Sequence, residues 1–270
     1  MCMLIVTGYG VTTDPASAQG RLEARYEASL AGVVVGKGDW AIEISDDQYS
    51  ASASGGSSGL LKMVSSGKGA TIAQGRMVSG QFVPATYVST ITSDKKSETI
   101  KLLMAGGSVK EFGIEPQPPA MPERLPIIDA HLRNVIDPMV GSMVRVPGTG
   151  ELVSQDACRS NASVFDGRMR YDLKLDFKRM EQVKAEKGYS GPVVVCAVYF
   201  KPISGFVPNR PSIKYLEAQR NMEVWLAPIA GTRVLVPFKL SAPTPFGTAA
   251  LEAIQFVTVA TPSKAASKTQ

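Results

Sequence analysis

The stretch that decides the fold is MRYDLKLDFK, residues 169–178, in which apolar and polar residues alternate without a break. Successive side chains of a β-strand point to opposite faces, so this stretch predicts a strand with one buried face and one wet face. Strands of this kind are typical of antiparallel sheets. The apolar side consists of Met169, Tyr171, Leu173, Leu175 and Phe177.

The same alternation recurs along much of the chain. Every second residue is apolar in LEARYEASL (22–30), WAIEI (40–44), MEVWL (222–226) and VLVPFKL (234–240). About twelve strands with one apolar face each cannot remain a flat sheet. We therefore expect a mainly β fold, either a strongly curved antiparallel sheet or a half-open β-barrel, wrapped around one short helix.

Turn residues separate the predicted strands. Gly106-Gly107 predicts a two-residue hairpin, and Asp166-Gly167 predicts a turn before the strand that starts at Met169. Gly36 and Gly38 inside a strand pattern indicate a bulge or bend, and Pro237 indicates a sheet edge or a bulge.

One segment departs from the β pattern. Five prolines in EPQPPAMPERLP predict an extended crossing over residues 115–127. After this crossing, Asp129 can cap a short helix, and Pro138 limits its length. The apolar residues at helical spacing are Leu132, Val135, Ile136 and Met139.

The beginning of the chain resembles the end of a secretory signal. A small-residue run, Ala16-Ser17-Ala18, fits an A-x-A cleavage site between Ala18 and Gln19, although the basic n-region is missing. Either translation starts further upstream or the segment is a ragged cytosolic terminus. On the first reading we expect residues 1–18 to be the remnant of a signal peptide, 19–258 a single β domain, and 259–270 a disordered tail.

Composition excludes some classes of protein. The chain is 44% apolar, yet no run approaches the roughly 18 to 20 apolar residues of a membrane helix. Its net charge of +5 weakly favours anionic surfaces such as lipid headgroups. Lys and Arg form no long run and no aromatics interleave them, so we do not expect a nucleic-acid partner.

The cysteines predict a disulfide bond. Removal of the signal remnant takes Cys2 with it and leaves Cys158 and Cys196, and an even count in an exported chain indicates a bridge. Cys196 lies within the apolar run VVVCAVYF and is expected to be buried, whereas Cys158 is expected in a loop. The alternative is two unpaired thiols.

We find no catalytic motif. His131 is the only histidine and lacks the partners of a metal site or a nucleophile, and Asp166 is better explained by its turn. We therefore predict no catalytic, cofactor-binding or metal-ligating residue and no cofactor, with a hydrolase using Asp166 or His131 as a minor alternative. Four aromatic residues on strand faces can either fill the core or line a ligand pocket: Tyr26, Trp40, Phe177 and Trp225.

Five longer stretches resemble domain-of-unknown-function family 3108, a family of proteobacterial envelope proteins. The resemblance covers roughly residues 21–258 and is carried by RYEASLAGVVVGKGDWAIEI (25–44), GRMVSGQFVPATY (75–87), FDGRMRYDLKL (165–175), GYSGPVVVCAVYFKPISG (188–205) and VWLAPIAGTRVLVPFKL (224–240). It implies a periplasmic location and a mostly β fold, and it implies no particular activity. At the level of architecture alone, the expected fold is similar to periplasmic lipoprotein carriers, whose half-closed barrels hold acyl chains.

These observations favour a non-enzymatic periplasmic protein. We expect it to bind a lipid or another cell-envelope component in the concave face of its curved sheet. The alternative is a structural or interaction protein of the envelope, with a filled core and no ligand. The sequence leaves the oligomeric state undetermined.

Overall fold

The computed structural model describes residues 19–58, 67–94 and 96–261. Most of them belong to one large sheet of strands in the order β7-β6-β5-β4-β3-β2-β1-β15-β14-β13-β12-β10-β9, with β8 added beside β14 and β11 beside β15. The pairing is antiparallel except between β11 and β15. The strands are β1 (Gly20–Leu30), β2 (Val33–Ile44), β3 (Gln48–Ser57), β4 (Lys68–Val78), β5 (Gln81–Ser93), β6 (Lys96–Ala105), β7 (Ser108–Glu115), β8 (Val144–Arg145), β9 (Asn161–Phe165), β10 (Arg170–Lys184), β11 (Lys187–Gly188), β12 (Ser190–Ser204), β13 (Glu223–Pro228), β14 (Val234–Thr244) and β15 (Gly247–Ala260).

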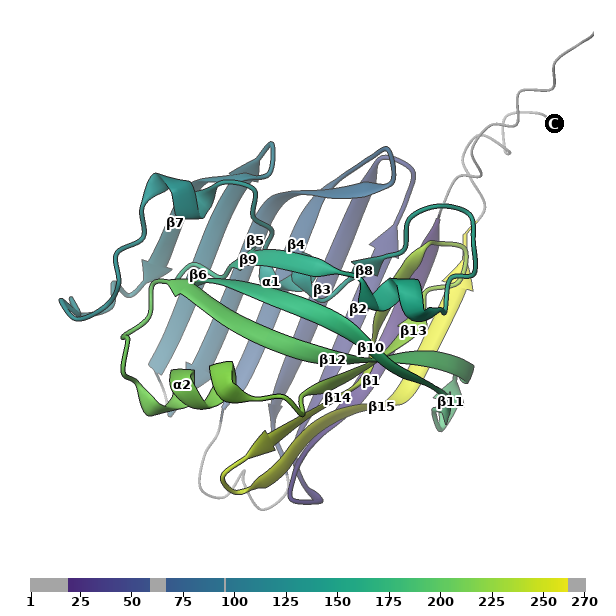
Figure 1. Ribbon diagram of the computed structural model, residues 1–270. Helices are drawn as coiled ribbons and strands as arrows, with labels where there is room; N and C mark the ends of the chain where they lie inside the picture. The colour runs from purple at the N-terminus through teal and green to yellow at the C-terminus, as the bar shows by residue number, and fades with distance from the viewer. Residues whose placement is uncertain (1–18, 59–66, 95, 262–270) are drawn as a thin grey trace, which may run out of the picture.

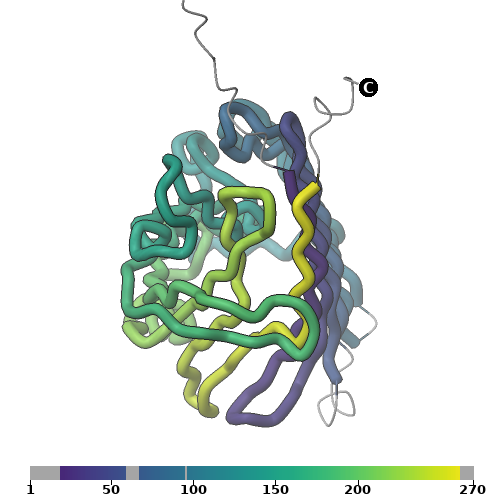
Figure 2. Tube along the Cα trace, turned by 90° about the vertical axis from the view of Figure 1, so that its right-hand side faces the viewer, coloured from purple at the N-terminus to yellow at the C-terminus, as the bar shows by residue number. Residues whose placement is uncertain are grey.

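The sheet folds back over itself. In Figure 1, β9, β10 and β12 cross in front of the strands β2 to β6. Figure 2 shows the same arrangement from the side, with the purple and blue N-terminal strands forming one layer and the green segments the other. The mainly β, curved antiparallel fold expected from the sequence is therefore confirmed, with fifteen strands in place of about twelve.

A short extended segment connects the two edges of the sheet. The Val135 amide donates to the Gly107 carbonyl at 3.0 Å, on the β7 side. On the β9 side, the Ile136 amide donates to the Ser163 carbonyl at 2.9 Å, and the Phe165 amide donates to the Ile136 carbonyl at 3.0 Å. The edge strands β7 and β9 are not paired with each other. The segment bridges them through these hydrogen bonds, so the open sheet becomes barrel-like.

The helix prediction was wrong in position and in number. Asp129 begins only the 3₁₀ turn η2 (Asp129–Leu132), and the α-helix α1 (Pro138–Gly141) starts where the predicted helix was to end. Pro at the first helical position is favoured, and Asp137 before it is the cap: its Oδ1 accepts from the Met139 and Val140 amides at 2.9 and 3.0 Å. The residue before a proline disfavours the helical conformation, and Asp137 is accordingly extended, with φ −76° and ψ 164°.

Two further helical segments were not predicted. They are the 3₁₀ turn η3 (Gln155–Cys158) and the α-helix α2 (Pro211–Ala218). Because α2 has no buried residue, the sequence contains no apolar stripe that could have revealed it. Residues 116–128, where the extended crossing was expected, contain no strand or helix, and the Arg124 amide closes a turn there by donating to the Met121 carbonyl at 3.0 Å.

Turns and bulges lie where the sequence indicates them. Gly106 and Gly107 form the β6–β7 turn with φ angles of +57° and +70°, which are unfavourable for other residues. The β1–β2 register shifts beside Gly36, and the β13–β14 register shifts beside Pro237. The tail boundary was wrong, because β15 runs through Val259 and Ala260, which pair with the first residues of β1.

The space between the two layers is filled by side chains of the chain itself. One hydrophobic cluster extends from the N-terminal strands to β14 and β15. Its largest fully buried members include Leu22, Ile42, Phe165, Phe238 and Phe256. Three rings, Tyr189, Phe238 and Phe256, pack against one another with centroids 5.5 to 6.5 Å apart.

A second, smaller cluster lies on the opposite face of β12, β13 and β14. Residues 142–160, which we call the cover segment, place Val144, Val146 and Ala157 against Val194 and Leu235 of this cluster. The cover segment is attached by the predicted disulfide between Cys158 and Cys196, whose Cα atoms are 5.5 Å apart. Residues 193–197 are consequently all buried, and the burial expected for Cys196 from its apolar run is confirmed.

Candidate functional site

Tyr26 and Trp40, two of the four aromatic residues considered for a ligand pocket, are buried in the main core. They are 4% and 9% exposed, and their ring centroids are 6.5 Å apart. The Tyr26 hydroxyl donates to the Pro237 carbonyl at 2.7 Å, which connects β1 to β14 across the interior. Burial raises the pKa of Tyr26 well above its usual value. Both residues thus fill space that a ligand would need.

Trp225 is buried beneath a cluster of charged side chains. Its Nε1 donates to Glu181 Oε2 at 2.7 Å, while the Arg179 guanidinium and the Lys239 ammonium lie 5.5 and 5.4 Å from the ring centroid. The hydrogen bond from Trp225 is the main cause that lowers the pKa of Glu181. The Trp225 side chain therefore already has a hydrogen bond and two cation–π contacts with neighbouring side chains.

Phe177 is not a core residue, and this prediction is corrected. It is 44% exposed. Its register with Cys196 continues that of Leu175 with Val198, and the bulge in β10 comes only after it. The alternation therefore predicted its strand face correctly, but not whether another segment covers that face. The four aromatic residues do not form one pocket.

The two residues considered for hydrolysis have structural roles. Asp166 Oδ1 accepts from the Arg168 and Met169 amides at 2.8 and 2.7 Å, and so shapes the turn before β10. Burial raises the pKa of Asp166. His131 Nδ1 accepts from the Ile128 amide at 3.3 Å within η2.

A buried carboxylate that the sequence analysis missed lies in the interior. Asp137 is 0% exposed, and its Oδ2 has no hydrogen-bond partner among the described residues. Burial raises the pKa of Asp137 from 3.8 to about 6. Its charge contributes, after burial, to raising the pKa of Tyr49, Tyr87 and Tyr171. The signal that could have revealed this cap is the Asp-Pro pair at 137–138, a common helix start.

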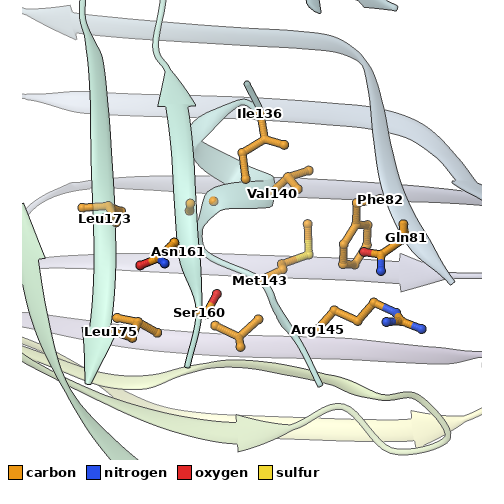
Figure 3. A pocket seen from close by; sticks show the side chains of 13 residues that line it. Gln81, Phe82, Ile136, Val140, Met143, Arg145, Ser160, Asn161, Leu173 and Leu175 are labelled. Atoms are coloured by element: carbon orange, nitrogen blue, oxygen red, sulfur yellow. The ribbon is translucent and has the colours of Figure 1, made fainter. Parts of the chain in front are cut away.

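A pocket of about 220 Å³ is lined by α1, the cover segment with β8, β9, β10 and the first residues of β5 (Figure 3). We call it the Arg145 pocket. Most of the lining residues are apolar, and Arg145 is the one charged residue among those that the structure describes. The lining side chains that Figure 3 labels are Gln81, Phe82, Ile136, Val140, Met143, Arg145, Ser160, Asn161, Leu173 and Leu175.

Arg145 has no ion pair or hydrogen bond from its guanidinium within the part of the chain that the structure describes. It is half-buried, on β8 between the buried Val144 and Val146. Other arginines of the fold do have partners: Arg168 pairs with Glu98, and Arg179 with Glu223. An unpaired, partly desolvated cation in a pocket wall is a candidate ligand contact.

A second pocket, of about 620 Å³, lies where β1, β2, β3, β4 and β15 meet at one end of the sheet. Its charged residues are Arg21 and Glu43, and they pair with each other at 3.5 Å. This pocket is larger than the Arg145 pocket, but its charges are already compensated. Among the residues in the described ranges, no group of three or more His, Cys, Asp or Glu could hold a metal ion.

Comparisons with known proteins give a family and distant structural neighbours. A search of curated proteins finds no match. The chain is similar to a solved structure described as a β-barrel-like protein of domain of unknown function DUF1849 from Brucella abortus, with 8% sequence identity and a TM-score of 0.46. The similarity covers 90% of this chain and 99% of that one.

None of the helices in the described ranges is long and apolar enough to cross a membrane.

The family model described as "Protein of unknown function (DUF3108)" matches residues 25–254, and the chain belongs to this family.

Proposed function

We propose that this chain is a non-enzymatic periplasmic protein that binds a component of the cell envelope, and that it does so in the Arg145 pocket. The observation that carries this proposal is an unpaired, half-buried arginine in the wall of an otherwise mostly apolar pocket. Ligand sites have this character, with an apolar lining and a few polar groups that fix orientation.

The packing of the interior supports a site at this pocket over one in the concave face. Tyr26, Trp40, Phe238 and Phe256 occupy the space between the layers, and the Tyr26 hydroxyl is already bonded to the opposite strand. A lipid there would have to displace the main core. The Arg145 pocket requires no such displacement.

The surroundings of the acidic residues support a non-enzymatic function. Both Asp166 and Asp137 use an oxygen to accept two backbone amides each. The free oxygen of Asp137 is completely buried, so a substrate cannot reach it without opening of the core. A general acid or base must lie within hydrogen-bond reach of its substrate.

The disulfide supports the periplasmic part of the proposal. Disulfides persist in oxidising compartments such as the bacterial periplasm and are rare in the cytosol. The Cys158–Cys196 bridge together with the small-residue run 16–18 favours export. The run itself lies outside the described residues.

The filled core also favours a second candidate, an interaction protein of the envelope that has no ligand. The two functions differ in what contacts the mouth of the Arg145 pocket: a small molecule in the first case and a protein surface in the second. Gln81 is exposed at this mouth and provides a position from which to distinguish them.

The test is photo-crosslinking in the native host, with a photoreactive amino acid at Gln81 and, as the control, at Glu23 on the exposed face of β1. We expect adducts from position 81 and not from position 23, in the periplasmic fraction. A small-molecule adduct supports ligand binding, and a protein adduct supports the interaction alternative. Equal labelling from both positions, or recovery of the protein in the cytosol, contradicts the proposal.

A further inference from the structure

We infer that the ligand of the Arg145 pocket is an anionic amphiphile, a molecule with a carboxylate or phosphate head and a short apolar segment. This inference rests on the proposed binding function of the pocket and names the chemistry of its ligand. It follows from a single cation at one end of a wall that also carries apolar side chains. Figure 3 shows Arg145, Gln81 and Phe82 toward one end, and Leu173 and Leu175, with Asn161 and Ser160 beside them, at the other.

The position of the Arg145 guanidinium is set by a close approach to a turn. A Cβ atom on Gly80 would lie 2.8 Å from Arg145 Nη2 and 3.2 Å from its Nε, so the guanidinium packs directly over this glycine. Gly80 also has a φ of +71°, which other residues rarely adopt. Held in this way, the planar guanidinium can present two parallel donors to a carboxylate or phosphate.

Among the described residues that line the pocket, no carboxylate compensates the charge of Arg145. The other polar lining groups are Gln81, Ser160 and Asn161, which are neutral and can donate hydrogen bonds. Partial burial of an unpaired cation is unfavourable, and an anion that enters the pocket relieves this cost. The charge of the pocket thus selects anions over cations.

The apolar side chains of the wall favour an apolar group on the ligand. Leu173 and Leu175 of β10 line the side away from Arg145, next to the neutral Asn161 and Ser160. The apolar Val140 and Met143 lie between that side and Arg145 (Figure 3). With about 220 Å³, the pocket is smaller than the roughly 300–1,000 Å³ of sites that enclose drug-sized ligands. It therefore accommodates a short apolar segment and leaves the rest of a larger ligand outside.

The experiment is isothermal titration calorimetry on the full mature chain. The probes are octyl phosphate and octanoate, inorganic phosphate as head alone, octanol as tail alone, and octyltrimethylammonium as the opposite charge. We expect both anionic amphiphiles to bind more tightly than either half alone, and the cation not to bind. Arg145→Gln should lower the affinity for octyl phosphate about 10- to 100-fold, as expected for loss of a charge-assisted hydrogen bond. It should leave the affinity for octanol unchanged.

Two further variants keep the test decisive. Arg76→Gln makes the same charge change at an exposed position of the neighbouring strand β4, outside the pocket wall, and should leave every affinity unchanged. Ala162→Leu fills the pocket from β9 and should lower the affinity for octyl phosphate to that for inorganic phosphate. Equal weakening by Arg145→Gln and Arg76→Gln overturns the inference, as does equal binding of octyl phosphate and inorganic phosphate.

Vesicles identify the source of the ligand. Sedimentation with phosphatidylglycerol vesicles that requires Arg145 assigns the head group to a membrane lipid, and binding of monomeric amphiphiles alone assigns it to a free molecule. Both outcomes support the inference. If position 81 captures a small molecule in cells while no anionic probe binds, the proposed function stands and the inference fails.

Discussion

The exposed face of β1 and β2 and the covered face of β12 to β14 belong to the same sheet, yet different contacts stabilise them. On β1 and β2, charged residues form ladders across the strands, as in the Arg25–Asp39 pair at 3.1 Å and the Lys37–Glu27 pair at 2.7 Å. On β12 to β14, the corresponding face is apolar and packs under the cover segment.

The difference shows that the burial of a strand face depends on what the rest of the chain places over it. The face of β1 and β2 remains wet, and buried and exposed residues of β1 alternate from Gly20 to Tyr26. The face of β12 to β14 is dry because the cover segment reaches it and is bonded to it at Cys158. Four measurements test this comparison.

The largest change in the free energy of unfolding is expected from removal of the disulfide. The cysteines are 38 positions apart, so the bridge closes a loop of 39 residues. Closure of a loop of this length stabilises a fold by about 4 kcal/mol on the chain-entropy model. The double variant Cys158→Ala, Cys196→Ala should lose about this much free energy of unfolding in a urea titration. A loss under about 1 kcal/mol would show that the cover segment is held by packing alone.

The next effect compares two leucines of β14. Leu235 is 0% exposed beneath the cover segment, whereas Leu240 is 38% exposed. Leu235→Ala should cost about 2–5 kcal/mol, since it leaves a cavity, and Leu240→Ala should stay near 0.5 kcal/mol. Urea unfolding of both variants measures this contrast. Similar losses at the two positions would mean that the covered face is not tightly packed.

The third effect concerns Asp137, which lies beside the segment that connects the sheet edges. Its folded pKa of about 6 exceeds its ordinary value of 3.8, so the folded state binds the proton more tightly than the unfolded state. The stability from this group is fully present below pH 4 and is lost as the pH rises through 6.

Asp137→Asn removes this dependence. The unfolding free energy of Asp137→Asn relative to wild type should therefore rise by about 1–3 kcal/mol between pH 4 and pH 7. Thermal or urea unfolding at a series of pH values gives the difference directly. A difference that does not change with pH would place Asp137 in contact with solvent or a cation.

The smallest effect is expected on the wet face. The side chains of Arg25 and Asp39 are 56% and 64% exposed, so their coupling should be about 0.2–1 kcal/mol and should decrease with salt. A double-mutant cycle with Arg25→Ala and Asp39→Ala measures it. Coupling well above 1 kcal/mol would indicate that a partner or a second copy shields this face.

Local features were predictable from the sequence where the cause is local. The Gly106-Gly107 hairpin, the Asp166-Gly167 turn and the bulges beside Gly36 and Pro237 each depend on the backbone preference of one or two residues. The disulfide was predictable because only two cysteines remain beyond the presumed signal.

The sequence-based predictions were wrong where contacts between distant segments determine the local structure. Asp129 and Asp137 are both reasonable helix caps by sequence, but residues 135 and 136 pair with the β6–β7 turn and with β9, which excludes helix there. Phe177 follows the alternation of its stretch and lies on the same strand face as Leu175, yet it is exposed, because alternation does not determine how far another segment covers a face.

The sequence by itself therefore determined the strands, the turns between them and the bridge, because alternation and turn preference act over two to four residues. Only the tertiary structure decided which faces are dry, that Tyr26 and Trp40 fill the interior, and that Arg145 stands unpaired in a pocket. Each of these depends on segments far apart in the chain that lie side by side, as Arg145 does with Gly80 and Leu235 with the cover segment. The spacing of residues in a sequence does not encode which distant surface covers them.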